Sequence, residues 1–292
     1  MKTLKPIFNQ KLISAALAII FVGTLILVSG NASATTYGDN ITVYDGVGTN
    51  GTGLGQEDNE AEPGMVQSQA WDLEGFFLNG TQLTIVGGYN FYTGKDGMDA
   101  GDIFIDTNGD AVASPNTIPG FIYEPYDSND SITETYQIVS NSYFKYDYVL
   151  DIDWAAGTFA IIQLDPNSLL KDTEYGSAYN IPSNPWIYES GGQVVGGGDF
   201  EDYNNANTSG SDTGLLGWNG DDNHYAATFN LSFIAAGFTG IDLRNGALFH
   251  NTMECGNDNL IGRVAPVPEP ATMLLLGTGL AGMIGLRRRK KA

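Results

Sequence analysis

The chain has 292 residues, of which 13 are Lys or Arg and 34 are Asp or Glu, so its formal net charge is −21. Nucleic acid and anionic membrane surfaces are poor partners for such a chain, because both carry negative charge. Divalent cations are good partners, although the same charge can serve solubility alone. The single cysteine, Cys255, excludes an intramolecular disulfide, and we expect it to be a small buried side chain.

The N-terminus carries the three parts of a secretory signal. Lysines precede an apolar run at residues 12–28, and the small-residue triplet Ala32-Ser33-Ala34 follows it. A charged region, a hydrophobic region and a cleavage site in this order are typical of an export signal. We therefore predict a signal peptide at residues 1–34.

The body, residues 35–265, is long enough for one domain with a substantial core. Apolar and polar residues alternate at 228–233 and 146–154, as in half-buried strands, and no long stretch has helical periodicity. Many short strands between Gly- and Asn-rich turns predict an all-β fold, an antiparallel β-sandwich of jelly-roll-like topology. Further strands are expected at 70–78, 82–85, 102–106, 133–140, 157–164, 186–190 and 247–251, and a long loop at 191–222 with one short strand at 193–195.

The sharpest candidate for chemistry is the segment Asp106-Thr107-Asn108-Gly109-Asp110. Hard Ca²⁺ prefers oxygen ligands, and the first, third and fifth residues of a tight loop direct their side chains at one centre. Asp106, Asn108 and Asp110 occupy these positions. The segment therefore predicts a calcium loop.

A complete EF-hand is excluded by the residues that follow this segment. Ala111 stands where that motif needs Gly, and Thr117 stands where it needs a bidentate Glu. A short Ca²⁺ loop would need a distant acid to close it, such as Asp102 or Asp99. The alternative is a β-hairpin without metal, because Asn-Gly between two apolar runs is the commonest hairpin turn.

The tryptophans suggest carbohydrate binding, because sugar rings stack on exposed aromatic faces. A Trp within a strand is more often part of the core, and we expect this of Trp71 and Trp154. Trp186 and Trp218 stand in predicted loops. They are the predicted sugar contacts.

Two carboxylates, Asp151 and Asp153, share one face of a predicted strand, and paired acids can carry out glycosidic acid/base chemistry. Catalytic acids usually come from different strands, however, and acids on a solvated face need no catalytic explanation. His224 is expected to be a solvated loop residue, since His250 is the only other histidine and no zinc spacing exists. We therefore expect no enzymatic activity.

The C-terminus ends in a proline-rich motif, an apolar segment and a basic cluster. Val267-Pro268-Glu269-Pro270 cannot form helix or central strand, because each proline lacks a donor and restricts its neighbour. The apolar residues 271–286 end at Arg287-Arg288-Arg289, which would stay on the cytoplasmic side of the inner membrane. The segment is shorter than the roughly 20 residues of a permanent span, so we predict a transient membrane hold at residues 266–292.

These C-terminal residues resemble the sorting signals of the PEP-CTERM family, which are processed by the membrane enzyme exosortase. The body is similar to a group of PEP-CTERM surface proteins in four short segments: Glu62-Pro63-Gly64, Trp71-Asp72-Leu73-Glu74, residues 101–106 and residues 253–258. The resemblance implies export in a Gram-negative cell, processing or exchange of the tail by exosortase, and delivery to the cell surface or the extracellular polysaccharide matrix. It implies a location and no reaction.

Three functions follow, in order of preference. The first is a non-enzymatic surface or matrix protein of an exopolysaccharide or biofilm layer, with a Ca²⁺-stabilised body. The second is a carbohydrate-binding module that contacts matrix polysaccharide through the loop tryptophans. The third is a glycan-cleaving enzyme that uses Asp151 or Asp153.

Overall fold

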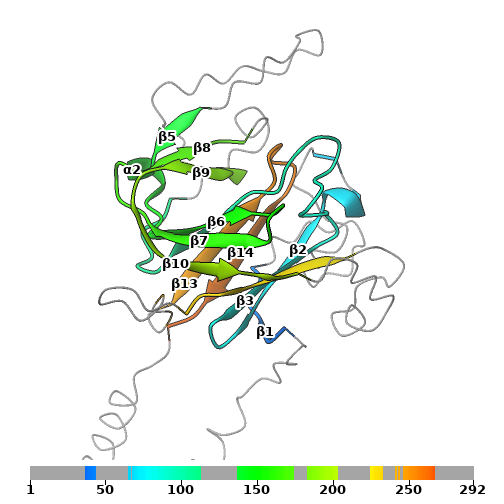
Figure 1. Cartoon of the computed structure of the whole chain (residues 1–292), viewed down its shortest axis with the longest axis horizontal. Coiled ribbons are helices and arrows are strands. Elements are labelled where there is room, and N and C mark those ends of the chain that lie inside the picture. The colour runs from blue at the N-terminus through cyan, green and yellow to red at the C-terminus, as the bar shows by residue number, and fades with distance from the viewer. Residues whose placement is uncertain are drawn as a thin grey trace, which may run out of the picture. The chain divides into compact units, whose positions relative to one another are not determined.

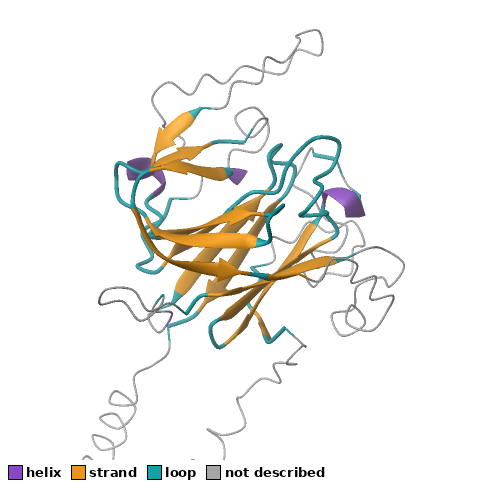
Figure 2. Ribbon diagram, in the orientation of Figure 1, coloured by secondary structure: helices purple, strands orange, loops and turns teal. Residues whose placement is uncertain are grey.

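The computed structural model of the chain describes residues 37–43, 65–66, 68–112, 137–173, 183–202, 224–232, 241, 243 and 246–266. In these segments strands dominate, and helix is limited to short turns such as η1 (Gln69–Trp71) and α2 (Asn141–Phe144) (Figure 2). The predicted signal peptide, the sorting motif with Arg287, Arg288 and Arg289, and Trp218 lie outside the described residues.

The strands form three antiparallel sheets (Figure 1). The five-stranded sheet has the order β1 (Asp39–Asn40), β2 (Leu73–Asn79), β3 (Gln82–Gly87), β12 (Tyr225–Asn230) and β11 (Glu201–Asp202). The six-stranded sheet has the order β10 (Gln193–Asp199), β7 (Thr158–Gln163), β6 (Tyr148–Asp153), β4 (Ile103–Asp106), β13 (Ala247–Thr252) and β14 (Asn259–Val264). The small sheet has the order β5 (Ile138–Ser140), β8 (Leu169–Lys171) and β9 (Ile187–Ser190).

The two large sheets share one hydrophobic core. Phe76 and Ile85 from the five-stranded sheet pack in the same buried cluster as Ile105, Leu150 and Phe249 from the six-stranded sheet. Burial of such side chains is the main stabilising term of a domain, at about 2 kcal/mol for each fully buried one. The predicted all-β antiparallel sandwich is confirmed.

A second, smaller core lies on the opposite face of the six-stranded sheet. Phe104, Val149 and Ile162 point away from the main core and pack against Val139 and Leu170 of the small sheet. The small sheet therefore covers part of the outer face of the six-stranded sheet. The carboxylates of the candidate site lie on this face, where the register exposes polar side chains.

Strand β10 differs from the sequence-based prediction. It extends from Gln193 to Asp199, whereas a strand of three residues inside a long loop was expected. Its glycines 196–198 have low strand propensity, so the sequence pattern did not mark them. Pairing with β7, from Gln193 opposite Gln163 to Asp199 opposite Thr158, overrides that local preference.

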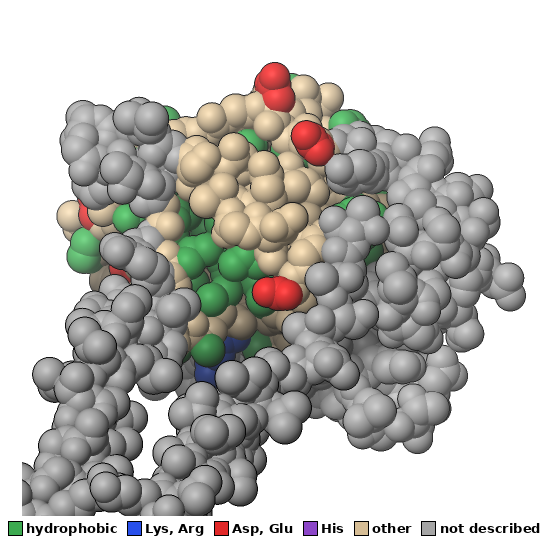
Figure 3. Space-filling view, turned by 90° about the horizontal axis from the view of Figure 1, so that it is seen from below, with side chains coloured by type: hydrophobic (Ala, Val, Ile, Leu, Met, Phe, Trp, Pro, Cys, Tyr) green, Lys and Arg blue, Asp and Glu red, His purple; other side chains and the backbone are tan. Residues whose placement is uncertain are grey.

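The described surface carries few cations. Figure 3 shows one face of the molecule, where the described acidic side chains stand apart and the described basic ones are confined to one small area beside hydrophobic side chains. In the body, basic residues occur at only five positions: Lys95, Lys145, Lys171, Arg244 and Arg263.

Candidate functional site

The hairpin of β6 and β7 places two carboxylates on the outer face of the six-stranded sheet. Side chains alternate along a strand, so Ile152 is buried in the main core while Asp151 and Asp153 point the other way. Asp153 is opposite Thr158 and Asp151 is opposite Ala160. Since a strand rises about 3.3 Å per residue, the α-carbons of the two acids lie roughly 6.6 Å apart.

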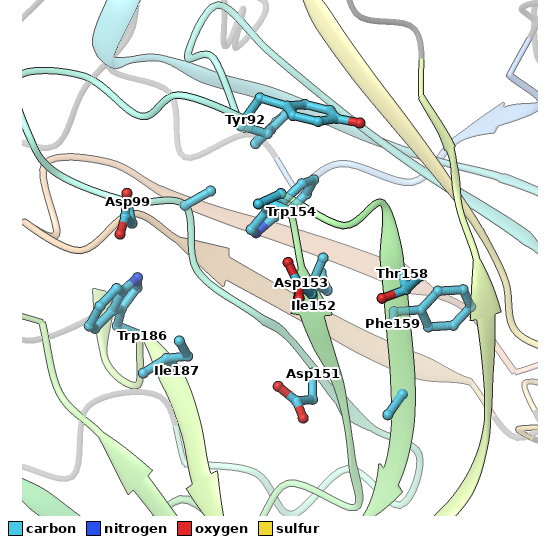
Figure 4. A pocket seen from close by; sticks show the side chains of 14 residues that line it. Tyr92, Asp99, Asp151, Ile152, Asp153, Trp154, Thr158, Phe159, Trp186 and Ile187 are labelled. Carbon is cyan, nitrogen blue, oxygen red and sulfur yellow. The ribbon is translucent and has the colours of Figure 1, made fainter.

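These carboxylates line a cavity of about 650 Å³, here called the acidic cleft. Figure 4 shows Asp99 and Trp186 on one side of it and Thr158 and Phe159 on the other, with Asp151 and Asp153 between them. The volume is typical of a small-molecule site. The remaining lining residues are Phe91, Tyr92, Ala100, Ile152, Trp154, Ala155, Ala160 and Ile187.

Aromatic side chains form much of the wall of the acidic cleft. Trp154 is 8% exposed and stacks on Phe91 with ring centroids 5.0 Å apart and an interplanar angle of 14°. Trp186 is 7% exposed, so it presents part of its ring to the cavity and not a flat open face. The prediction that Trp154 is a core residue is confirmed, and Trp71 is half-buried against the same core.

The segment Gly101-Asp102 holds the cleft together. Oδ1 of Asp102 accepts the backbone N–H of Ile152 at 2.9 Å, and Oδ2 accepts that of Tyr188 at 2.8 Å. The first bond fixes β6 between its two outward acids, and the second fixes β9 beside Trp186. Gly101 has no room for a side chain, because a β-carbon would meet the carbonyl oxygens of Trp186 and Thr252. Asp102 is therefore a positioning residue of the cleft.

The electrostatics of the acidic cleft are set by burial and by like charges. Burial first, and then the nearby charge of Asp153, raise the pKa of Asp151. Asp151 in turn contributes, after burial, to a raised pKa of Tyr188. Among the described residues that line the cleft, none is Lys, Arg or His. A cation or a hydrogen-bond donor entering the cleft would relieve this repulsion.

The predicted calcium loop follows β4 and is closed by its own hydrogen bonds. Oδ1 of Asp106 accepts the backbone N–H groups of Asn108 and Gly109, both at 2.9 Å, and Oδ2 accepts that of Ala111 at 3.1 Å. Oδ1 of Asn108 accepts the N–H of Asp110 at 2.9 Å. Asp106 is 3% exposed, whereas Asp110 is exposed to solvent.

The structure does not bring Asp102 to this loop, because both of its oxygens serve the cleft. Asp99 also serves elsewhere: it lines the cleft, and its backbone N–H donates to Oε2 of Glu254. In the described part of the chain, no group of three metal-binding side chains is present. The calcium ion itself stays a prediction.

His224 was expected to be a solvated loop residue, and this was wrong. It is 4% exposed, and its Nδ1 lies 2.6 Å from Oε2 of Glu74, which is fully buried. Gln69 donates from Nε2 to the other oxygen of Glu74. Only the pairing of β3 with both β2 and β12 brings these residues together, so no local pattern marked them. Cys255 is buried in the main core, as expected.

The sequence also did not identify the cleft as a single site. It marked Asp151, Asp153 and Trp186 separately, and it did not mark Tyr92 or Thr158 as functional. These residues come from β6, β7, the position just before β9 and the turn after β3. The sequence showed only that acidic and aromatic residues are frequent in these segments. It did not show which strands pair, so it could not bring the residues together in one site.

Among the residues that the structure describes, none belongs to a helix that is both long enough and apolar enough to cross a membrane. No curated protein and no solved structure matches the chain. One family model does match: residues 266–290 fit the PEP-CTERM protein-sorting motif. The match includes the predicted motif Val267-Pro268-Glu269-Pro270 and the basic cluster. The chain therefore carries a PEP-CTERM sorting tail, which marks it as an exported extracellular or surface protein held transiently at the membrane and processed there by exosortase.

Proposed function

We propose that this protein is a non-enzymatic component of an extracellular polysaccharide or biofilm layer, and that it binds matrix polysaccharide in the acidic cleft. The observation that carries the proposal is the combination of aromatic walls and carboxylates around one cavity on an exported body. Aromatic rings supply apolar area for the faces of sugars, and carboxylates accept hydrogen bonds from sugar hydroxyls. A polysaccharide partner also matches the destination implied by the sorting tail.

Binding uses Trp186 differently from the sequence-based prediction. A Trp that is 7% exposed offers an edge to a sugar that enters the cavity, and not a platform on which a polymer lies flat. Tyr92 is only half-buried and lines the same cavity, so it offers the larger accessible ring. The sugar therefore packs between Tyr92 and the edge of Trp186.

Affinity electrophoresis of the full-length chain in mild detergent, in gels that contain the host's extracellular polysaccharide, tests this proposal. We expect retardation of the wild type and about fivefold weaker retardation of Tyr92→Ala. Tyr143→Ala is the matched control, since Tyr143 is an exposed tyrosine on α2 that does not line the cleft. Unretarded migration of the wild type in every polysaccharide of the matrix would reject the proposal.

Glycan cleavage is the second candidate function. The observation in its favour is that Asp151 and Asp153 line the same cavity from one face of β6, and a pair of carboxylates flanks the scissile bond in most glycosidases. The raised pKa of Asp151 suits a general acid. Reducing-end assays on the bound polysaccharide decide between the two functions: release that Asp151→Asn and Asp153→Asn each abolish establishes the enzyme.

We propose further that Ca²⁺ stabilises the loop Asp106–Asp110, with the exposed carboxylate of Asp110 as its main ligand. Asn108 and Asp110 line a second cavity of about 340 Å³ together with Asp147, Asp165 and Lys145, so the described carboxylates there outnumber the one described cation. Asp106 is a poor probe, because its carboxylate holds the loop with or without metal. Calorimetric titration should give a heat of Ca²⁺ binding that Asp110→Asn abolishes; no heat from the wild type would reject calcium.

A further inference from the structure

The charges of the described residues that line the acidic cleft indicate the kind of sugar that it binds. Asp99, Asp151 and Asp153 line the cavity, and no Lys, Arg or His is among the lining residues that the structure describes. From these groups we infer that the ligand is a polysaccharide with free amino groups, such as a partly deacetylated hexosamine polymer. This inference rests on the proposed polysaccharide binding and names its substrate class.

The positions of the carboxylates favour a cation between them. Asp151 is half-buried and Asp153 is exposed, on one face of β6. Burial makes a charge costly, and the nearby like charge of the other acid adds repulsion. An ammonium group placed between the two acids turns this repulsion into attraction for both.

The acidic character continues beyond the cavity across the neighbouring strands of the six-stranded sheet. Asp153 on β6, Thr158 on β7 and Asp199 on β10 are aligned across three adjacent strands and share the outer face of the sheet. Ala160 and Gly197 form the neighbouring row, opposite Asp151. The small residues of this row lie beside the row of Asp153 and Asp199 and leave the surface open, so a chain with repeated amino groups can meet more than one carboxylate.

Other polysaccharides fit the cleft less well. A uronate or sulfated chain would bring negative charge to an acidic site on a chain of net charge −21, which repels it. A neutral chain would donate hydroxyl hydrogen bonds to the carboxylates but bring no opposite charge, so it would stabilise them less than an ammonium group does. A basic peptide could meet the acids but would leave the aromatic walls without the flat apolar ring faces that they suit.

The test compares oligosaccharides of equal length that bind to the full-length chain in mild detergent. Glucosamine oligomers should bind about tenfold more tightly than their N-acetylated counterparts, and raised ionic strength should reduce that preference. Oligouronates should bind more weakly than either, with or without Ca²⁺. Trilysine should bind more weakly than a glucosamine trimer.

Variants locate the effect in the cleft. Asp151→Asn and Asp153→Asn keep side-chain shape and should each reduce affinity for the glucosamine oligomer about fivefold to tenfold, with little change for the N-acetylated one. Asp39→Asn is the matched control, because it removes one exposed carboxylate from β1 in the other large sheet. It should leave both affinities unchanged.

The outcomes distinguish the amino-sugar inference from the proposed polysaccharide binding on which it rests. Equal or tighter binding of the N-acetylated or uronate oligomers overturns the amino-sugar inference but keeps polysaccharide binding. Trilysine that binds as tightly as the sugar also overturns it. Loss of the preference in Asp39→Asn would place the effect outside the cleft and reject the inference. If no oligosaccharide and no matrix polysaccharide binds, the proposed function itself fails.

Discussion

The aspartates at the two ends of strand β4 differ in how far along the sequence their hydrogen-bond partners lie. A buried aspartate at each end accepts backbone N–H groups: Asp102 before the strand and Asp106 at its last residue. The partners of Asp102, Ile152 and Tyr188, lie 50 and 86 residues away in the sequence. The partners of Asp106 lie two to five residues away.

An aspartate that binds neighbouring residues stabilises one loop, whereas an aspartate that binds distant residues stabilises the packing of the sheets. Asp106 shapes one turn, so its loss should be felt locally and its role can be read from adjacent residues. Asp102 connects the six-stranded sheet to the small sheet and fixes the walls of the acidic cleft. Its loss should therefore be felt both in global stability and in ligand binding.

The largest expected effect is that of Asp102→Ala. It leaves one buried and one partly buried N–H group without an acceptor. Each such group costs about 1 to 3 kcal/mol, so the free energy of unfolding should fall by about 4 kcal/mol. Urea denaturation measures the loss, and ligand binding in the cleft should fall with it. Asp102→Asn can still accept one bond and should lose less; equal losses in the two variants would contradict this role.

The middle of β4 supports a pH-dependent prediction through His250, which is opposite Phe104 and stacks on Tyr146 with centroids 5.9 Å apart. Burial lowers the pKa of His250 from 6.5 to about 3. Its contribution to stability is thus present above pH 6.5 and is lost as the pH falls toward 3. Between pH 7 and 4 we expect about 3 kcal/mol of acid-dependent loss, which His250→Phe should remove.

Thermal unfolding at several pH values measures the effect of His250→Phe. The substituted ring keeps the aromatic packing, so stability at pH 7 should change little. A variant that loses stability in acid as steeply as the wild type would contradict the assignment.

Asp172, next to the end of β8, has a hydrogen-bond partner at an intermediate sequence separation. Its Oδ1 accepts the N–H of Gln137, which is 35 residues away. Burial raises its pKa from 3.8 to about 6. This contribution is present below pH 3.8 and is lost as the pH rises through 6. Asp172→Asn should therefore gain about 2 kcal/mol relative to the wild type between pH 4 and 7, measured by urea denaturation. A constant difference across that range would reject the titration.

The smallest expected effect is that of Asp106→Ala. The amides it frees lie in a half-exposed loop and can be hydrated, so the loss should be about 1 kcal/mol. Polysaccharide binding in the cleft should not change. If this variant weakens binding as much as Asp102→Ala, the division between local and global roles is wrong.

The sequence predicted the features that depend on neighbouring residues, but not those that depend on strand pairing. The Asp106 loop, the alternating strands and the sorting tail depend on neighbouring residues, and local patterns marked all three. The cleft, the buried pair of Glu74 and His224, and the bonds of Asp102 depend on which strands pair. A period-two pattern shows that a strand has two faces but does not identify its neighbours. Strand β10 was underestimated because its glycines are favoured only by pairing with β7.

The strand order also bears on when the body can fold. Strand β3 pairs with β12 and β4 pairs with β13, so each large sheet joins residues near position 85 or 105 to residues near position 228 or 249. Loops of this length must close before either sheet is complete, which makes folding slow and dependent on late segments. Neither sheet can be completed until almost the whole body has crossed the membrane. The chain then reaches the sorting motif, at residues 266–290, soon after its last strand, β14, becomes available.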